Sequence, residues 1–348
     1  MIIKRCKAEH YQTLKHIFRR VYSSNPNLQK FRYFNWQFKE NPYNSDGEYT
    51  LWILEDSSEI KGFYGWIPVE VLTEKTLACE PILWWTAKDS KGFGIELLSK
   101  IVQNSSICLF HGCTSQSLDI FKHFRFQIFP LKRLIGVIDL DAVEHLFKIQ
   151  RSLNSMSILQ EFDPISYDIN TSRVNKINRF DNNEEMTFKN FSTITARLKY
   201  SSDFLNWRYV DIPDSSYQII RGEREGEYCI YRLEKIKNYD FSVLRIIEWS
   251  FGIDTANEAI AFLIKESNYN KVILIDFFCS SVEIGNLFKQ RNFGCSTDNI
   301  YNNIPYLFRP IKCTSNPMTA LYCNNNNYID NNYWYITKGN SDLDRVKF

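Results

Sequence analysis

The sequence FNWQFKENP, residues 34–42, recurs later in the chain as LNWRYVDIP, residues 205–213. Asn, Trp and Pro match between the two segments, as Asn35 with Asn206, Trp36 with Trp207 and Pro42 with Pro213, at a constant offset of 171 residues. A looser match relates SLDIFKHFRF, residues 117–126, to VEIGNLFKQRNF, residues 282–293, at an offset of 167. Two matches in the same order at similar offsets indicate a duplicated unit. Because this unit is much longer than a solenoid repeat, the sequence predicts two homologous domains.

The first copy predicts an ordered series of helices and strands. A helix at 10–22 is amphipathic, and a second amphipathic helix places Ile95, Leu98, Ile101 and Val102 on one side, which we expect to be buried. The remaining elements are strands at 49–56, 60–72, 77–87, 107–112 and 133–140, and a short helix that ends at residue 124.

The second copy repeats this order. It offers strands at 216–223, 228–235, 242–251 and 271–278, and helices at 256–266 and 283–293. Each copy therefore predicts an α/β fold in which helices flank a mixed sheet. We expect an N-terminal domain at 1–140, a linker at 141–184 that is rich in Asn, Ser and charge, and a C-terminal domain at 185–348. The Asn run at 324–327 is expected to be a surface loop.

Composition narrows the class of protein. The 348 residues are 44% apolar and 16% aromatic, which is enough for two cores and excludes wholesale disorder. A net charge of only +2 argues against a nucleic-acid partner. The N-terminal residues lack the apolar region of a signal peptide, and no run approaches the roughly 18 apolar residues of a membrane helix. We expect a cytoplasmic protein with no membrane partner, in which the nine cysteines stay reduced.

A G-x-G turn lies between a strand and a helix in the run KDSKGFGIELL, residues 88–98. Such a turn directs unpaired backbone N–H groups at a pyrophosphate, and Gly92 and Gly94 let the phosphate oxygens approach. A dinucleotide site would need a third glycine at Leu97, and a P-loop would need G-K-[ST]; both patterns are missing. The turn therefore favours a pyrophosphate held as in acyl-CoA enzymes.

The order of elements, this turn and the later aromatic helix resemble the GNAT superfamily of acyltransferases. The family pattern (R/Q)-x-x-G-x-G is matched at 89–94 except that Asp89 stands at its first position. The resemblance covers 1–140 with its motif and 185–312 through the duplication. It implies coenzyme A as the co-substrate and requires no metal. The residues expected to bind coenzyme A are Ala87, Lys88, Lys91, Gly92, Phe93 and Gly94.

The second copy differs at the equivalent turn. Its sequence there is FGIDTANEA, residues 251–259, which lacks the paired glycines and adds Asp254 and Glu258. Negative charge repels a pyrophosphate. We therefore expect one thioester site in each chain, with the second domain free to bind the acyl acceptor.

A narrower resemblance concerns the acceptor. The tandem layout, the segment NWRYVDIP and the tail YWYITKGNSDLDR, residues 333–345, are similar to bacterial sugar N-acyltransferases of surface-polysaccharide pathways. That resemblance implies transfer of an acyl group, acetyl or 3-hydroxybutyryl, to the amine of a nucleotide-linked sugar such as dTDP-3-amino-3,6-dideoxygalactose. The pathway would be that of O-antigen and lipopolysaccharide.

The resemblance also suggests where catalysis occurs. In the GNAT fold two central strands splay around the thioester, and a backbone N–H of Trp85 or Thr86 would polarise its carbonyl. The amine attacks directly, so the chemistry needs a base for one proton. Glu80, whose pKa burial would raise, and His111 are the candidates. A solvent-facing Glu80 and a hydrogen-bonded core His111 are the structural alternatives.

Other chemistry near His111 is not favoured. Some GNAT enzymes use a tyrosine in the later helix to protonate the thiolate, but this chain offers Phe121. Cys108 and Cys113 flank His111 without a second ligand pair at metal spacing, so no metal is predicted. A nucleophilic Cys113 would need a third, orienting group.

The acceptor site is expected in the second domain. A nucleotide sugar calls for flat aromatic surfaces and cationic side chains. The alternative for each aromatic residue is a place in the core. The candidates are Trp207, Arg208, Tyr209, Arg221, Arg224 and Trp249.

Two other functions stay open from the sequence. A related transferase that uses aminoacyl-tRNA to build peptidoglycan would need a strongly basic face, which the net charge of +2 disfavours. A non-catalytic acyl-CoA-binding protein would be expected to lose both turns, whereas only the second has changed. Formation of an acylated product would separate an enzyme from a binding protein.

Overall fold

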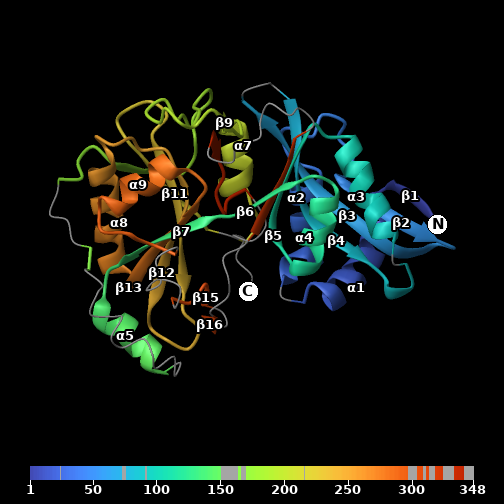
Figure 1. The fold of residues 1–348 in the computed structure, drawn as a ribbon, viewed down its shortest axis with the longest axis horizontal. Coiled ribbons are helices and arrows are strands. Elements are labelled where there is room, and N and C mark those ends of the chain that lie inside the picture. Colours follow the sequence, from blue (N-terminus) through green and yellow to red (C-terminus); the bar gives the residue numbers. More distant parts are fainter. Residues whose placement is uncertain are drawn as a thin grey trace.

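The chain forms two seven-stranded mixed sheets flanked by helices, which lie side by side (Figure 1). This is a computed structural model of the protein. It describes residues 1–23, 25–72, 76–90, 92–149, 164–165, 170–214, 216–296, 304–308, 311–312, 318–323 and 333–340. The predicted loop at 324–327 lies outside these residues.

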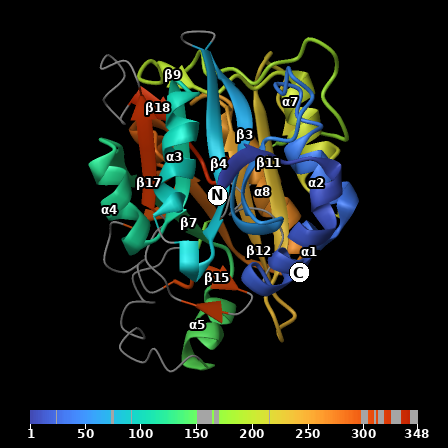
Figure 2. The same cartoon turned by 90° about the vertical axis from the view of Figure 1, so that its right-hand side faces the viewer.

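The first sheet has the strand order β1-β2-β3-β4-β5-β17-β6, and its half of the molecule faces the viewer in Figure 2. The helices α1 and α2 pack on one face, and α3 and α4 on the other. The elements are β1 (Ile2–Arg5), α1 (Tyr11–Val21), α2 (Phe31–Phe38), β2 (Leu51–Asp56), β3 (Glu59–Val71), β4 (Thr76–Thr86), α3 (Phe93–Gln103), β5 (Ile107–Cys113), α4 (Ser115–His123) and β6 (Gln127–Pro130), with short 3-10 helices η1 (Ala8–His10), η2 (Pro26–Gln29) and η3 (Lys88–Ser90).

The second sheet repeats the order as β8-β10-β11-β12-β13-β7-β14. Its elements are β8 (Asn175–Ile177), α7 (Ser202–Leu205), the single turn η5 (Asn206–Val210), β10 (Gln218–Arg221), β11 (Tyr228–Lys235), β12 (Ser242–Trp249), α8 (Ala256–Tyr269), β13 (Val272–Cys279), α9 (Val282–Lys289) and β14 (Gly294–Cys295). Helix α5 (Leu140–Ile149) and the small pairs β9 (Ala196–Arg197) with β18 (Trp334–Tyr335) and β15 (Leu307–Phe308) with β16 (Ile311–Lys312) lie outside the repeat.

The halves exchange one strand. Strand β7 (Lys132–Val137) lies between β13 and β14 of the second sheet, and β17 (Met318–Cys323) lies between β5 and β6 of the first. The predicted boundary at residue 140 divides the chain into two parts, but each sheet contains one strand from the other part. Within the predicted linker 141–184, β8 pairs with β10. The domain limits thus remain a description of the sequence repeat and not of the sheets.

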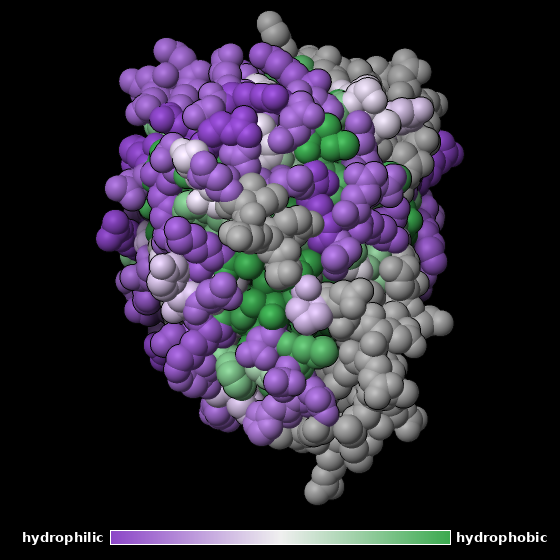
Figure 3. All heavy atoms as spheres, turned by 90° about the vertical axis from the view of Figure 1, so that its left-hand side faces the viewer, coloured by the Kyte–Doolittle hydropathy of each residue, from purple (hydrophilic) through white to green (hydrophobic). Residues whose placement is uncertain are grey.

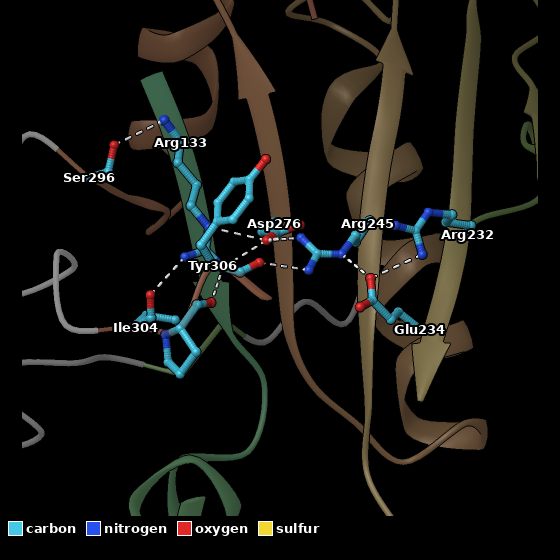
Figure 4. Close-up of polar contacts among 9 residues, drawn as sticks. Arg133, Arg232, Glu234, Arg245, Asp276, Ser296, Ile304 and Tyr306 are labelled. Atoms are coloured by element: carbon cyan, nitrogen blue, oxygen red, sulfur yellow. Dashed lines mark hydrogen bonds and ion pairs between the residues drawn. The ribbon is translucent and has the colours of Figure 1, made fainter. Parts of the chain in front are cut away.

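A buried ion network fixes the exchanged strand β7 (Figure 4). The Arg133 guanidinium on β7 donates to Asp276 on β13 at 2.8 Å, and Arg245 on β12 donates to the same carboxylate at 2.7 Å. Glu234 on β11 pairs with Arg245 and, at 3.0 Å, with Arg232. Removing one member of a buried pair leaves an uncompensated charge. The network therefore specifies which sheet β7 joins.

The two halves share one hydrophobic core, and its centre is symmetric. The indole N–H of Trp36 donates to the Trp207 carbonyl at 2.8 Å, and that of Trp207 donates to the Trp36 carbonyl at 3.0 Å. Their rings stack with centroids 5.0 Å apart. Equivalent residues that contact each other reciprocally are the signature of a two-fold interface. The structure thus confirms the duplication inferred from the offset of 171.

Most predicted elements are confirmed, but the strand predicted at 133–140 ends at Val137 and Leu140 already begins α5. A further difference concerns α3. Its buried side is formed by Leu97, Leu98, Ile101 and Val102, whereas Ile95 is 45% exposed. Figure 3 shows that the outer face of the second half is mostly hydrophilic, with small hydrophobic areas between polar ones. Among the described residues, no helix is both long and apolar enough to cross a membrane.

Candidate active site

Strands β4 and β5 diverge soon after they meet. Their parallel ladder has one residue pair, Cys79 with Cys108, and a bulge at Ile82 bends β4 where it faces β3. Bulges re-aim strands and are common beside active sites. We call the diverging segments, 80–86 of β4 and 109–113 of β5, the first fork.

Helix α3 begins at the open end of the first fork. Its N-cap is Gly92, with φ of 101°, and no side chain caps the helix. A Cβ at Gly94 would lie 3.2 Å from the Trp84 indole nitrogen, so glycine allows the helix to approach β4 closely. These backbone N–H groups can bind an anion. Among the other predicted coenzyme A residues, Ala87 and Phe93 are half-buried, Lys88 is exposed and Lys91 lies outside the described residues.

The equivalent turn in the second half contains a buried carboxylate. The Glu227 carboxylate accepts hydrogen bonds from the Thr255 hydroxyl at 2.6 Å and from the Gly252 N–H at 3.2 Å. Thr255 is the N-cap of α8, and Glu227 is 2% exposed. A carboxylate thus lies in the turn before α8, where the first half has the turn with Gly92.

The second fork, 247–249 of β12 and 278–279 of β13, is also filled. Residues 334–337, which we call the tail strand, enter it: Thr337 pairs antiparallel with Cys279, and the Ser280 N–H donates to the Ile336 carbonyl at 2.9 Å. Across the fork, the Trp249 N–H donates to the Tyr335 hydroxyl at 2.9 Å. In the part of the chain that the structure describes, no strand pairs with 80–86 on the side of β5.

Backbone alternation shows which N–H groups face the first fork. The Ala87 N–H donates to the Lys61 carbonyl on β3 at 2.7 Å, and alternate residues of an antiparallel ladder face the same way. Trp85 therefore faces β3. Trp84 and Thr86 face the fork, where both backbone groups of Trp84 bond the Tyr22 hydroxyl at 3.1 and 3.3 Å. Of the two predicted oxyanion donors, Thr86 has the suitable direction.

Glu80 and His111 point to the same face of the fork. Cys79 and Phe110 belong to the core cluster beneath α3, so their neighbours Glu80 and His111 point to the opposite face, toward the second half. Glu80 is 2% exposed. Its solvent-facing alternative is therefore wrong.

Arg208 of the second half reaches this same face. The positive charge of Arg208 lowers the pKa of His111, and it interacts electrostatically with the carboxyl group of Glu80. Burial opposes the charged form of Arg208, yet Tyr209, Tyr217 and Glu80 raise its pKa overall. We name Glu80, His111, Arg208 and Thr319 the interface cluster, because β4, β5, η5 and β17 bring them together.

His111 is held as a neutral ring. Its Nδ1 lies 3.1 Å from the Thr319 hydroxyl, and its buried Nε2 has no hydrogen-bond partner among the described residues. Burial and the charge of Arg208 lower the pKa of His111 to about 3. An imidazole with such a pKa is a weak proton acceptor, so the geometry favours Glu80 as the base.

The other predicted acceptor residues lie away from the interface cluster or inside the core. Trp207 stacks on Trp36, and Trp249 is fully buried against Phe288. The Tyr209 hydroxyl donates to Glu248 at 2.7 Å. Arg221 pairs with Glu184 and Arg224 with Asp254, both partly exposed.

Several residues at the site were not found from the sequence. Thr319 comes from the exchanged strand, and the Gly339 carbonyl accepts from Arg208 at 2.6 Å. The Asn340 amide donates to the Tyr200 hydroxyl at 3.0 Å. No local motif marks these residues, because they meet only through the exchange and the tail strand. The described residues hold no group of three or more His, Cys, Asp or Glu side chains placed to bind a metal. The Sγ atom of Cys108 lies 3.4 Å from that of Cys79.

Solved structures support the fold. No protein-family model and no curated sequence matches the chain. A candidate acetyltransferase from Pyrococcus horikoshii shares 10% identity, with a TM-score of 0.51 over 92% of this chain and 89% of that one. A GCN5-related N-acetyltransferase from Anabaena variabilis shares 11% identity, with a TM-score of 0.51 over 93% of this chain and 73% of that one.

Saccharomyces cerevisiae N-myristoyltransferase with bound myristoyl-CoA shares 10% identity, with a TM-score of 0.51 over 92% of this chain and 82% of that one. Similarity at this level concerns the fold. It spans both halves, so it confirms the predicted α/β class with two tandem GNAT-like units.

Proposed function

We propose that the protein is an acyl-CoA-dependent N-acyltransferase that binds one thioester in the first fork. The observation that carries this proposal is the contrast between the two forks. In the first, β4 and β5 diverge beside the start of α3, whereas in the second the tail strand enters the fork and the Glu227 carboxylate lies in the turn before α8. The similar yeast enzyme was solved with myristoyl-CoA bound, which supports the ligand class.

The residues present suit direct transfer to an amine. The N-terminus of α3 would bind the pyrophosphate, and the Thr86 N–H would donate to the thioester carbonyl. The amine nitrogen forms the new C–N bond while the C–S electron pair leaves on sulfur, and Glu80 takes the proton that the amine loses. Arg208 would keep the Glu80 side chain oriented from the side of the second half.

For the acceptor we propose a nucleotide-linked amino sugar, such as dTDP-3-amino-3,6-dideoxygalactose, with acetyl or 3-hydroxybutyryl as the acyl group. Support comes from the resemblance of NWRYVDIP and of the tail to sugar N-acyltransferases. The interface cluster adds a cation, Arg208, beside the proposed base. Surface-polysaccharide synthesis in the cytoplasm would be the setting.

Calorimetric titration with coenzyme A, and then with dTDP-linked amino sugars, tests the proposal. We expect one coenzyme A per chain. Gly94→Trp should abolish binding, because the indole would block the turn against Trp84. Ile253→Trp is the matched control, since it adds the same ring to the exposed turn of the second half and should bind normally.

Thermal unfolding of both variants would show whether they fold. If Gly94→Trp is folded and still binds coenzyme A like the unmodified protein, the proposed site is wrong. Two equivalents of coenzyme A per chain would contradict the contrast between the forks. Chromatographic detection of the acylated sugar would then establish the reaction.

A further inference from the structure

A cavity of about 240 Å³ lies in the first half of the molecule, among residues to which the proposed function gives no role. Its walls come from the strands β1 to β4, the C-terminal end of α3 and the loop that precedes β2. A water molecule takes up about 30 Å³ of liquid, so this volume is far larger than one water needs. Concave sites that combine aromatic and polar side chains typically bind small molecules.

The cavity is separate from the first fork. Cys79 lines it and belongs to the core cluster beneath α3, whereas Glu80 points to the opposite face of the sheet. Ile101, near the end of α3, also lines it, while the turn with Gly92 is at the other end of this helix. The nine residues from Gly92 to Ile101 span roughly 14 Å at about 1.5 Å each. A ligand here would not overlap the proposed pyrophosphate site.

Two indole rings form one wall of the cavity. Trp52 and Trp66 stack with their centroids 6.1 Å apart, and both side chains are only half-buried. Neither indole N–H has a hydrogen-bond partner among the described residues. The wall therefore offers a flat apolar surface together with hydrogen-bond donors.

The charges in the lining balance each other. The Arg5 guanidinium lies 5.3 Å from the centroid of Trp52 and 4.9 Å from that of Trp66. One of its nitrogens donates to the Asp46 carboxylate at 2.9 Å. Among the described residues that line the cavity, this pair supplies both formal charges; the Lys100 ammonium lies on Trp52, at 4.8 Å from its centroid, outside the lining. A lining without net charge favours a neutral ligand.

The remaining polar groups suit a ligand that carries several hydroxyls. The amide nitrogens of Asn44 and Asn104 already donate to backbone carbonyls, which leaves their side-chain oxygens as acceptors. Arg5 and the two indoles supply donors. Because a hydroxyl both donates and accepts, a polyhydroxy ring can bond groups of both kinds.

We propose that this cavity binds a neutral saccharide unit, a pyranose ring whose C–H surface packs on the indoles and whose hydroxyls bond Arg5 and the asparagine amides. The proposed acceptor would be acylated beside Glu80, on the opposite face of the sheet. This inference therefore does not rest on the proposed function, and the two sites can be filled at the same time.

Titration of the isotope-labelled protein with the methyl glycosides of glucose and galactose tests the proposal, with the chemical shifts of the indole N–H groups as the readout. The chain has eight tryptophans, and the variants Trp52→Phe and Trp66→Phe assign two of the eight signals. We expect these two signals to shift with a Kd of about 1 mM, typical of a ligand of this size. Saturating coenzyme A should leave that Kd unchanged.

Trp66→Leu should bind the glycosides at least about tenfold more weakly, followed through the Trp52 signal. Trp85→Leu is the matched control, because Trp85 is also half-buried but packs on Phe63 on the opposite face of the same sheet. This variant should bind normally. If Trp66→Leu does not fold, the shifts in the unmodified protein still decide between binding and no binding.

Asp46→Asn tests the argument from charge. The substitution removes one charge from an exposed loop residue and leaves Arg5 uncompensated. Glucuronic acid should bind the unmodified protein more weakly than methyl glucoside does, and Asp46→Asn should reverse that order. An unchanged order in Asp46→Asn would contradict the role of charge balance.

Four results would overturn the assignment: no shift at Trp52 and Trp66 with either glycoside, tighter binding of glucuronic acid by the unmodified protein, shifts with thymidine alone, or competition between a glycoside and coenzyme A. The second would indicate an anion site, the third a nucleoside site and the fourth a sugar in the fork. Failure to bind coenzyme A would overturn the proposed function and leave this site standing.

Discussion

The two halves repeat the same strand order but treat their forks differently. In the first half, β4 and β5 share one residue pair and α3 starts without a side-chain cap. In the second half, β12 and β13 share five pairs, Glu227 bonds Gly252 and Thr255 in the turn before α8, and the tail strand enters the fork. The comparison shows that a duplicated unit can keep its strand order while, in the described residues, a segment of the same chain enters only one of its two forks.

The difference extends to the polar residue beside each bulge. The bulges at Ile82 and Ile247 align the halves at an offset of 165, so Glu80 corresponds to Arg245. Arg245 is part of the buried ion network, whereas Glu80 faces the second half beside Arg208. One position has thus been used for stability in one half and is available for chemistry in the other.

The largest expected effect tests this contrast directly. Glu80→Gln keeps the size and polarity of the side chain but removes the proton acceptor. We expect kcat for acyl transfer to fall about 10²- to 10⁴-fold, with coenzyme A affinity unchanged. The rate of free thiol release with an accepted amine measures it.

His111→Asn is the informative comparison for Glu80→Gln. Because the pKa of His111 is about 3, this ring is a weak proton acceptor, and we expect a loss below about tenfold. A larger loss in His111→Asn than in Glu80→Gln would assign the base to His111. Full activity in both would remove both from the mechanism.

Much of this fold could be predicted from the sequence, because periodicity and the repeat are local signals. The strand at 133–140 was also expected, but not its partner sheet. The two sheets are equivalent, so an apolar strand such as β7 fits the same position in either one. Its choice depends on Arg133 meeting Asp276, a contact between residues 143 positions apart.

The candidate site was predictable only in part. The turn at 89–94, Glu80, His111 and Arg208 were found, since they lie in strands or motifs. Trp207 and Trp249 could not be separated from core residues by pattern alone.

We expect Glu248, which lies at the second fork, to make the free energy of unfolding depend on pH. Burial raises the pKa of Glu248 from 4.5 to about 7, although hydrogen bonds from Tyr209 and Tyr335 and the charge of Arg208 act in the opposite direction. The folded state therefore holds a proton that the unfolded state releases. The contribution is fully present below about pH 4.5 and is lost as the pH rises through 7, a change on the order of 3 kcal/mol.

Glu248→Gln should flatten this dependence. Denaturant unfolding between about pH 5 and pH 8 measures the free energy of unfolding, and we expect the variant to lose less stability over that range. Glu9→Gln, at an exposed site, is the control and should follow the unmodified protein. If the free energy of unfolding changes with pH in the same way for Glu248→Gln and for the unmodified protein, Glu248 does not titrate in this pH range.

The smallest effect concerns the centre where the halves are still alike. Trp36→Phe and Trp207→Phe each remove one indole N–H and leave one carbonyl of the partner without its donor. We expect each to lower the free energy of unfolding by about 1–3 kcal/mol, with the two values close to each other. Since the rings stack, the double variant should deviate from additivity by about 0.5–1.5 kcal/mol. Unequal single effects with no coupling would show that this contact is symmetric in shape but not in energy, and that the divergence of the halves has reached their shared core.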